Sequence, residues 1–499
     1  MAKLADIYRA VTDTVRNPFS TDTAGLADAR RTTAVELADG DSVELTAAPV
    51  RKRLGEADVR MLAYNGSIPG PTLRVKQGSE ISVDFRNDAD VETTVHWHGL
   101  RLDNRFDGVP ESHGGRQAPV APGERFTYRL RFPDPGIYWY HPHVREDYSQ
   151  ELGLYGNILV KPSDPDYWAP VNRDLVIVLD DILLKGSQIA PFSRDESNRT
   201  AMGRYGNVML INGETQFDFN AARGEVVRIY LTNTANVRPF RFSIPGARMK
   251  LVGGDAGRVE HERFVTGVLV APSERAVVEV LFDRPGELAL EHSGPERSYR
   301  LGTVYVGDTP IGHSYAAEFE ALRTDPALRG RRAGLDADLR READKNLALV
   351  ADMPGMRDHG GGHAHVDIEW EDNMQLHNRM TTPQTMFWRL VDLDTGAVNH
   401  EIDWSFRAGE RVKLRIVNET NSDHPMQHPF HIHGERFLVL ARDGMPNDNL
   451  VWKDTVLVPT GQTVDLLVEM DNPGQWMAHC HIAEHLEGGM MLGFRVQGA

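Results

Sequence analysis

The feature that most constrains the fold of this chain is a strand pattern that occurs three times along its 499 residues. Each unit begins with a glycine-containing turn and a strand of alternating polar and apolar residues, and later has two strands joined by a Pro-Gly turn. This alternation indicates strands with one buried face, and the turns indicate hairpins. The paired segments are 71–88 with 122–143, 217–234 with 272–292, and 402–420 with 459–481. Repetition on this scale predicts three domains of one kind.

We therefore predict an all-β protein with three β-sandwich domains, at residues 32–165, 170–310 and 344–499. The length agrees with this number, since a domain usually takes about 150 residues. Residues 1–31 are expected to form an N-terminal extension and residues 311–343 a charged linker.

Two segments lack the strand pattern. The stretch 316–346 is highly charged and helix-prone, which predicts a solvated linker helix. The stretch 353–374 is rich in glycine, histidine and methionine, which is typical of a loop and predicts one inside the third domain.

The composition excludes several classes of protein. A mean hydropathy of −0.41 excludes a bundle of membrane-spanning helices, so we expect no membrane span. The formal net charge of −17 disfavours binding to nucleic acid or anionic lipid. The first fifteen residues are amphipathic, without the apolar stretch of a secretory signal. Either an export signal has been removed, or the protein is cytoplasmic.

Histidines gather in four short motifs: HWHGL at 96–100, HPH at 141–143, HPFHIHG at 428–434 and HCHIAEH at 479–485. These motifs hold ten of the 20 histidines. Because alternate residues of a strand face the same side, each His-x-His pair can present two imidazoles to one metal. The second domain has only His292 at the matching place, so we expect no metal there.

Cys480 is the only cysteine of the chain. His479 and His481 flank it, and His485 and Met490 follow at intervals of five residues. A thiolate, imidazoles and a thioether are the donors of a blue-copper site. In a strand, Cys480 would face one side and its two neighbours the other. This arrangement predicts two metal sites joined by the backbone, which suits electron transfer.

With all four motifs present, the chain resembles the three-domain multicopper oxidases, the group that includes bacterial laccases and cuprous oxidases. The resemblance extends over most of residues 32–499. It implies cupredoxin-like Greek-key domains and four copper ions, of which one is a blue mononuclear copper and three form a trinuclear cluster. It also implies dioxygen and a small reducing substrate as partners, and a periplasmic or extracellular location.

The resemblance implies a ligand at every position of both sites. The blue copper would be held by His428, Cys480 and His485, with Met490 as a weak axial ligand. Met491 is the neighbouring alternative, but strand alternation lets only one of the two methionines face the metal. The trinuclear cluster would use His96 and His431 for its single copper and, for its coupled pair, His98, His141, His143, His433, His479 and His481.

Three residues are candidates for catalysis by the same resemblance. Electrons would enter through the edge of His485, which is usually exposed in the family, and dioxygen would take up four electrons and four protons to give two waters. Glu484 and Asp107 match positions of carboxylates that relay protons or orient cluster water. An acidic residue is by default a solvated surface group. Because Glu484 lies between copper ligands, we favour the relay role there, and less strongly for Asp107.

Three hypotheses for the function remain open, and they differ in the substrate. The leading hypothesis is a laccase-type oxidase of phenols or aromatic amines, with an open site near His485. The second is a metallo-oxidase that converts Cu(I) to Cu(II), because thioethers and imidazoles suit Cu(I). Its candidate residues in and after the loop are Met353, Met356, His359, His363, His365, Met374, His377, Met380 and Met386. The third is copper storage, which the complete trinuclear set disfavours.

Overall fold

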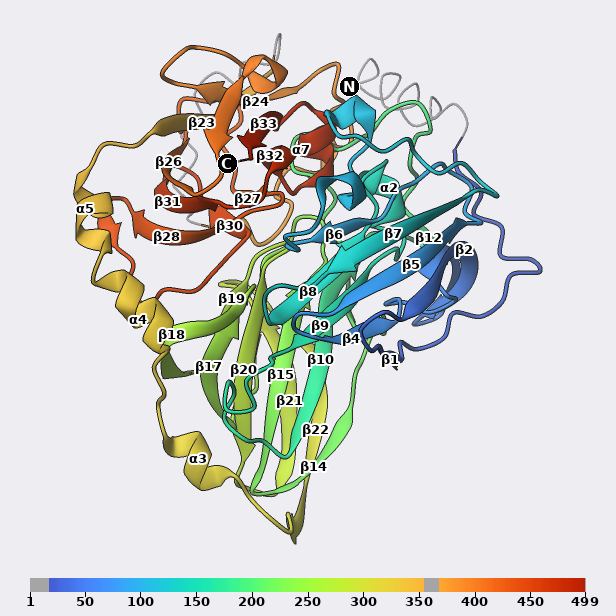
Figure 1. Cartoon of the computed structure of the whole chain (residues 1–499). Helices are drawn as coiled ribbons and strands as arrows, with labels where there is room; N and C mark the ends of the chain where they lie inside the picture. Colours follow the sequence, from blue (N-terminus) through green and yellow to red (C-terminus); the bar gives the residue numbers. More distant parts are fainter. Residues whose placement is uncertain (1–17, 354–367, 499) are drawn as a thin grey trace.

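The computed structural model of this chain describes residues 18–353 and 368–498. Its strands form three pairs of sheets, and each pair comes from one continuous stretch of chain (Figure 1). This confirms the prediction of an all-β fold. The strands of the three pairs span residues 34–161, 173–310 and 345–497, and the finer domain boundaries stay a prediction.

The first domain packs a four-stranded sheet against a five-stranded one. The four-stranded sheet has the order β3 (Ala57–Tyr64), β2 (Ser42–Leu54), β5 (Glu80–Asn87) and β7 (Arg125–Arg131). The five-stranded sheet has the order β1 (Ala34–Glu36), β4 (Thr72–Lys76), β9 (Gly156–Lys161), β8 (Gly136–His141) and β6 (His96–His98). Short helical turns η1 (Asn104–Phe106), η2 (Glu111–His113) and α2 (Glu146–Ser149) lie in its loops.

The second domain packs a six-stranded sheet against a five-stranded one. The larger sheet has the order β13 (Val208–Ile211), β10 (Arg173–Ile182), β15 (Glu225–Asn233), β20 (Arg275–Phe282), β17 (Arg248–Gly254) and β18 (Gly257–Val265). The smaller has the order β14 (Phe219–Arg223), β22 (Ser298–Pro310), β21 (Gly286–Ser293), β16 (Phe240–Ser243) and β19 (Val268–Val270). A small hairpin, β11 (Leu184–Lys185) and β12 (Gln188–Ile189), projects from the domain.

The third domain repeats the topology of the second, strand for strand. Its larger sheet has the order β24 (Phe387–Asp392), β23 (Lys345–Asp352), β26 (Glu410–Asn418), β31 (Thr463–Met470), β28 (Arg436–Arg442) and β29 (Met445–Pro446). Its smaller sheet has the order β25 (Trp404–Arg407), β33 (Met491–Gln497), β32 (Gly474–Cys480), β27 (His428–Ile432) and β30 (Thr455–Val458). Helices α6 (Gln375–Asn378) and α7 (Ala483–Glu487) and the turn η3 (Asn399–Glu401) lie in its loops.

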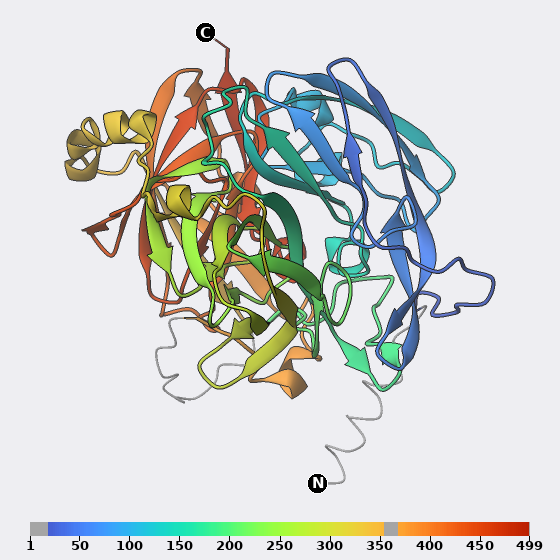
Figure 2. The ribbon, with the colours of Figure 1, turned by 90° about the horizontal axis from the view of Figure 1, so that it is seen from below.

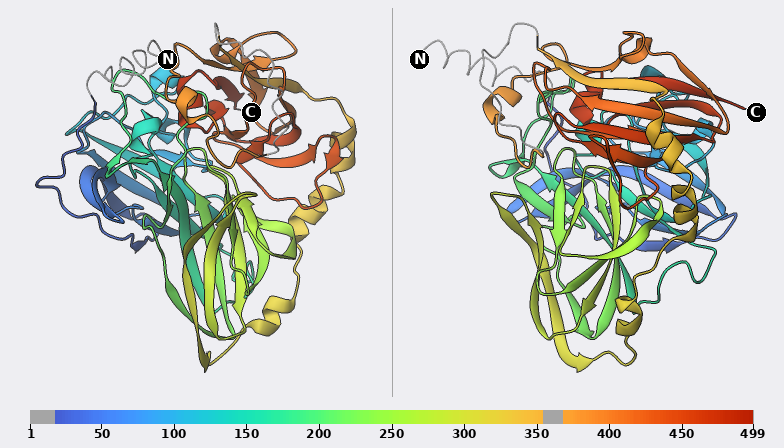
Figure 3. Two further views of the ribbon diagram at one scale, coloured as in Figure 1. Left: turned by 180° about the vertical axis from the view of Figure 1, so that it is seen from behind. Right: turned by 90° about the vertical axis from the view of Figure 1, so that its left-hand side faces the viewer.

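The first and third domains lie side by side, and the second domain lies beneath both (Figures 1 and 3). The view from below shows the blue strands of the first domain and the red strands of the third on opposite sides of the molecule (Figure 2). Each sandwich has its own apolar core. Parts of the second domain also join the neighbouring cores, and the segment with Ala201, Met202 and Tyr205 belongs to the core of the third domain.

The linker differs from the predicted solvated helix. It forms three short helices, α3 (Ala316–Glu320), α4 (Pro326–Arg332) and α5 (Leu335–Arg340), which run along the outside of the second and third domains (Figure 1). Phe319 is buried against the second domain, and Leu328 and Leu335 are buried against leucines of the third. Burial of these three side chains is why the charged segment is not fully solvated.

The N-terminal extension is described from residue 18 onward. Phe19 is buried in the core of the first domain, where its ring stacks on Tyr148 with 3.6 Å between centroids. Most of the predicted loop at 353–374 lies outside the described residues, which resume at residue 368. Within the described residues, no helix has the length and apolar character needed to cross a membrane.

Candidate metal centre

The thiol of Cys480 lies in a buried group with two imidazoles of the third domain. His428 begins β27 and Cys480 ends the neighbouring strand β32, while helix α7 brings His485 back over both. The Cys480 Sγ atom lies 3.4 Å from His428 Nδ1 and 3.5 Å from His485 Nδ1. The two Nδ1 atoms are 3.2 Å apart. Three donor atoms therefore converge on one point, as the sequence predicted.

The two methionines after this group differ in their surroundings. Met490 is fully buried and belongs to the same apolar cluster as Cys480. Met491 is half-buried and packs against a separate cluster of Val109, Met477 and Leu486. These positions favour Met490 as the axial ligand.

His485 is covered rather than exposed, which makes the expected open edge of this residue wrong. Its side chain has no exposed surface. Its Nε2 atom lies 3.2 Å from the carbonyl oxygen of Ala201, and the ring of Trp388 stacks on it at 4.0 Å. The Trp388 indole N–H in turn donates to the carbonyl of Thr200. A backbone segment of the second domain thus separates the imidazole from solvent.

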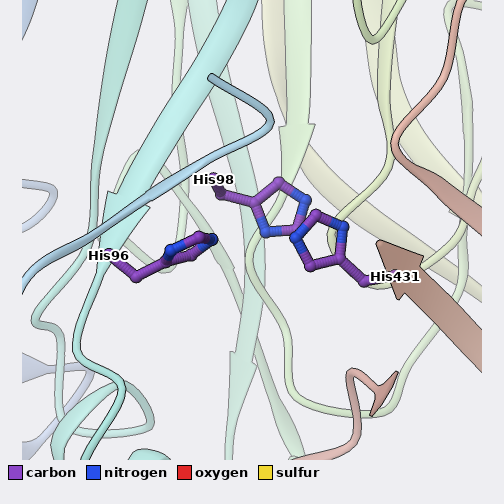
Figure 4. A group of neighbouring side chains, drawn as sticks. All are labelled: His96, His98 and His431. Atoms are coloured by element: carbon purple, nitrogen blue, oxygen red, sulfur yellow. The ribbon is translucent and has the colours of Figure 1, made fainter. Parts of the chain in front are cut away.

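The other predicted histidine ligands lie between the first and third domains and are all buried. Six of them form two triads whose donor atoms lie within 4.8 Å of one another: His98, His141 and His481, and His143, His433 and His479. His96, His98 and His431 form a third such group, in which the rings of His98 and His431 stack at 3.8 Å and His96 points toward them (Figure 4). All eight come together although their motifs are far apart in sequence.

Most of these imidazoles are oriented by a hydrogen bond at one ring nitrogen. His96 Nδ1 lies 2.7 Å from the Asp107 carbonyl oxygen, and His431 Nδ1 lies 2.8 Å from the Asp454 carbonyl oxygen. His141 Nδ1 is held by the Pro142 carbonyl in the same way. The Nε2 atoms of these three histidines are buried without a hydrogen-bond partner among the described residues. A ring fixed at one nitrogen with the other left free is typical of metal ligands.

Two carboxylates also hold histidine rings of this cluster in place. Asp107, which the sequence marked as a candidate, has one carboxylate oxygen 3.0 Å from His433 Nδ1. Asp454 was not predicted, and its carboxylate oxygen lies 2.9 Å from His98 Nε2. Arg275 of the second domain donates to the same Asp454 oxygen over 2.6 Å. No sequence pattern pointed to Asp454, because it lies 356 residues from His98.

Cys480 and its neighbours face different groups, as predicted from strand alternation. Cys480 contacts His428 and His485, whereas His479 joins the triad of His143 and His433. His481 belongs to the other triad. Two adjacent peptide units therefore connect the thiol group to the histidine cluster.

Burial shapes the protonation of both groups. It is the largest cause of a lowered pKa for His428 and His481, to about 3 in each case. It also raises the pKa of the Cys480 thiol. The imidazoles are therefore neutral and able to bind a metal, while the thiol releases its proton when it becomes a metal ligand.

Comparison with known proteins identifies the family. Family models described as multicopper oxidase match residues 47–165, 174–293 and 367–499, one in each pair of sheets. The chain is a multicopper oxidase. It is therefore an oxidoreductase with cupredoxin-like domains that uses four copper ions, dioxygen and a reducing substrate.

Individual relatives agree over nearly the whole length of the oxidase. It is 29% identical to multicopper oxidase MmcO of Mycobacterium tuberculosis, over 89% of this chain and 85% of that protein. It is 23% identical to copper resistance protein A of Escherichia coli, over 92% of this chain and 93% of that protein. A multicopper oxidase structure from Pseudomonas thermotolerans aligns with a TM-score of 0.67 and 27% identity, over 93% of this chain and all of that one.

The residues of the oxidase fit copper. The Cys480 group offers one sulfur and two nitrogen donors, which is the set typical of blue-copper sites. The cluster offers eight imidazoles, with the Asp107 carboxylate beside His96 and His433. Buried ring nitrogens of His96, His141, His143 and His431 have no other partner among the described residues. A buried polar atom without a partner costs free energy, so these nitrogens are arranged for a ligand.

Two acidic residues lie beside the histidines, and each has a carboxylate oxygen without a hydrogen-bond partner among the described residues. Glu484 in α7 is fully buried, and its Oε2 accepts a hydrogen bond from Asn236 while its Oε1 has no partner among the described residues. Glu146 has one oxygen 3.2 Å from His143 Nδ1. Sequence reasoning missed Glu146, although its position three residues after the HPH motif was an available signal. Burial raises the pKa of Glu484 to about 7.

Proposed function

We propose that this multicopper oxidase is a laccase-type enzyme that oxidises phenols or aromatic amines by single electrons and passes the electrons to dioxygen. The observation that carries this proposal is a cavity of about 450 Å³ beside the segment that covers His485. Arg199 and Tyr205 line the cavity, and Ala201 between them contacts His485. The volume lies in the range of sites for small organic molecules, about 300–1,000 Å³.

The proposed ligands are those that the sequence indicated. His428, Cys480, His485 and Met490 would hold the blue copper, and His96 and His431 the single copper of the cluster. The coupled pair would divide between the two triads. When bound, copper supplies the one-electron couples that oxidise the substrate and reduce dioxygen to water.

The protein itself has four tasks in this proposal. The segment at Ala201 keeps His485 dry and in place, so that an organic molecule is oxidised across it rather than in contact with the ligand. The peptide units on either side of Cys480 connect the two groups. Glu484, with its pKa raised to about 7 by burial, can release a proton near neutral pH and take it up again. Asp107 orients His433 through its Nδ1 atom.

The second candidate is oxidation of Cu(I), which the name of the Escherichia coli relative favours. Among the residues predicted for it, Met353 and Met386 are buried in the apolar core, which supports packing rather than metal binding. Met380 is exposed at the cavity. Met356, His359, His363 and His365 lie outside the described residues. Membership in an oxidase family disfavours copper storage.

Oxygen uptake separates the two candidates. Steady-state rates would be measured at fixed oxygen with dimethoxyphenol and, separately, with Cu(I), for the wild type and for a variant with Met356, His359, His363 and His365 replaced by alanine. The laccase-type proposal expects phenol turnover that this variant retains. Turnover of Cu(I) alone, lost in the variant, would replace it with the second candidate.

We also propose a periplasmic or extracellular location, which rests on the family resemblance. Fractionation of cells that express the native gene tests it, and enzyme found only in the cytoplasmic fraction would contradict it.

A further inference from the structure

The cavity beside the segment that covers His485 carries positive charge on a strongly negative protein. Four cationic side chains line it: Lys185, Arg199, Arg297 and Arg379. Among the described residues, two acidic ones line the same cavity, Glu371 and Asp372. The net charge of the whole chain is −17, so this local excess of cations runs against the general surface. Such a reversal in a cavity favours an anionic ligand.

The two acids of the cavity are already bound by other residues. Glu371 lies 3.0 Å from the buried guanidinium of Arg238 and accepts a hydrogen bond from the Tyr299 hydroxyl over 2.7 Å. Asp372 accepts hydrogen bonds from the Met374 backbone N–H and from the Asn378 amide. Their charges are therefore engaged within the wall. Among the cations, Arg379 donates to the Gln375 carbonyl and Arg297 pairs with Tyr299, which leaves Lys185 and Arg199 to face a ligand.

Arg199 is the cation that is least satisfied by the protein. Its side chain is only 9% exposed, yet no described residue accepts a hydrogen bond from its guanidinium or forms an ion pair with it within 4.0 Å. Burial is the main reason that its pKa falls to about 10, with Arg204 and Arg379 adding to the effect and Asp372 and Glu484 opposing it. At neutral pH it remains charged. No Arg199 nitrogen is among the buried atoms without a partner, so the guanidinium is accessible from the cavity, where a ligand can accept its hydrogen bonds.

The backbone holds Arg199 in place. Its φ angle of 70° is unusual for a residue with a side chain. The conformation is fixed by hydrogen bonds from the Arg199 N–H to the Thr381 carbonyl, and from the Gly203 N–H to the Arg199 carbonyl. Strain that surrounding contacts maintain is a common mark of a functional position.

The remaining walls suit an aromatic ring. Leu183, Leu184 and Pro191 line the cavity, and Leu376 and Met380 are exposed there by 53% and 39%. Tyr205 adds an aromatic wall and lies in the same segment as Ala201, whose carbonyl contacts His485. A ring that packs against these side chains lies beside the segment that covers the imidazole.

We propose that this cavity is the substrate site, that its preferred reductant is a phenol bearing a carboxylate, and that Arg199 binds that carboxylate with its guanidinium. This inference rests on the proposed laccase-type function and narrows its substrate class. Guanidinium and carboxylate match geometrically, with two parallel hydrogen bonds. The same positive charge disfavours Cu(I) and protonated amines at this site.

The electrons and protons balance with dioxygen as the oxidant. Each bound phenol loses one electron to the enzyme and one proton to water, and leaves as a phenoxyl radical that keeps the negative charge of its carboxylate. Four such oxidations deliver four electrons, and one dioxygen takes these up with four protons to give two waters. Arg199 is a binding residue in this scheme and exchanges no proton.

A pair of matched substrates tests the proposal. Dihydrosinapate carries a carboxylate that two methylene groups separate from its phenol ring, and its methyl ester has the same ring without the charge. Steady-state oxygen uptake by the copper-loaded wild type would be compared with Arg199→Gln, and with Arg407→Gln, an exposed arginine on β25 outside the cavity, as the matched control. Calorimetry with trimethoxyphenylpropanoate, which has no phenol to oxidise, measures binding alone.

We expect the wild type to favour the acid over the ester in kcat/KM. Loss of a charge-assisted hydrogen bond corresponds to about a tenfold or greater effect, so Arg199→Gln should raise KM for the acid and Kd for the unreactive acid by at least that factor. The ester should stay within about twofold of wild type, and Arg407→Gln should change neither.

Equal use of acid and ester by the wild type would overturn the substrate class. An equal loss for both substrates in Arg199→Gln would overturn the binding role and indicate that Arg199 only shapes the segment over His485. In both cases the phenols would still be oxidised, so the laccase-type function would survive. Oxidation of Cu(I) with no turnover of either phenol would instead remove that function.

Discussion

The second and third domains place different residues on the same framework. In the third, β27 pairs with β32 in a register that sets Phe430 opposite Cys480 and His431 opposite His479. In the second, β16 pairs with β21 so that Phe242 stands opposite His292. The next pair along β16 is Ser243 with Glu291. His292 thus occupies the position that corresponds to the thiol.

His292 acts in packing, whereas its counterpart Cys480 belongs to the proposed blue-copper site. Its Nδ1 atom accepts a hydrogen bond from the Arg241 backbone N–H over 3.0 Å. Its ring lies 4.7 Å from Phe240, which stands where the third domain has His428, and is parallel to Tyr299 at 5.7 Å. The two domains show that the sandwich fold determines where the side chains lie. A metal site forms only where donor side chains occupy several of these positions together.

The largest effect is expected for Cys480→Ser. Loss of the thiolate should remove the intense visible absorption and reduce oxygen uptake to background, while the histidine cluster keeps its copper, so that the content falls from the family's four ions to three. Visible spectra and elemental analysis check this. His292→Asn, at the corresponding position of the second domain, is the control and should keep all four. A blue band that persists in Cys480→Ser would refute the proposed ligands.

Asp107→Asn should have the next largest effect. The variant keeps an oxygen near His433 but loses the negative charge, so oxygen reduction should fall by about 10–100-fold, as for other residues that orient metal ligands. The blue absorption should not change, because Asp107 contacts the cluster and not the Cys480 group. Oxygen-uptake rates and spectra of the same sample test both parts. Asp283→Asn, an exposed site on the second domain, should change neither.

Glu369→Gln tests a segment that contacts both the second and the third domain. Glu369 accepts a hydrogen bond from the Gln427 N–H beside His428, and Trp370 lies 5.9 Å from His292. Burial raises the pKa of Glu369 from 4.5 to about 7. The stability that this group contributes is therefore fully present below pH 4.5 and is lost as the pH rises through about 7.

The variant should lack this pH dependence. Relative to Glu369→Gln, the wild type should lose about 1–3 kcal/mol of unfolding free energy on going from acid to mildly alkaline pH. Thermal unfolding of both proteins across that range measures the difference. If the unfolding free energy of the two proteins changed equally with pH, Glu369 would have an ordinary pKa.

His292→Cys is expected to change the protein least. It tests whether a thiol at the position that corresponds to Cys480 is enough to make a copper site. A thiol alone should not create a second blue site, because Phe240 occupies the place of a ligand and offers no donor atom. Copper content should stay the same, and stability should fall by about 1 kcal/mol, as for a typical buried substitution. An additional copper ion with a second blue band would show that one donor is enough.

Residues close together in sequence made the ligand set predictable. His479, Cys480 and His481 reveal both groups because alternation along a strand fixes the side each one faces. The repeated strand pattern likewise predicts the three sandwiches. The linker shows the limit, since charge and helix propensity at 316–346 do not reveal that Leu328 and Leu335 find apolar partners on another domain.

Contacts between distant segments could not be predicted. The cover over His485 comes from Ala201, 284 residues away, and no pattern near either residue indicates that they meet. The family resemblance suggested that one edge of the His485 ring is exposed. In the structure, residues 199–205 pack against the third domain and cover this ring. The positive cavity was missed for the same reason, because its cations come from separate stretches of the chain.

Arg275 sets an order for the biosynthesis of this enzyme. It joins the second domain to Asp454 of the third, and Asp454 in turn holds His98 of the first. The histidine cluster therefore needs all three domains in their final arrangement, and a nascent chain on the ribosome cannot complete it before His479 and His481 emerge. Copper that fills the whole cluster then enters after the domains have docked, and a substitution in the second domain can produce an enzyme that folds but stays colourless or inert.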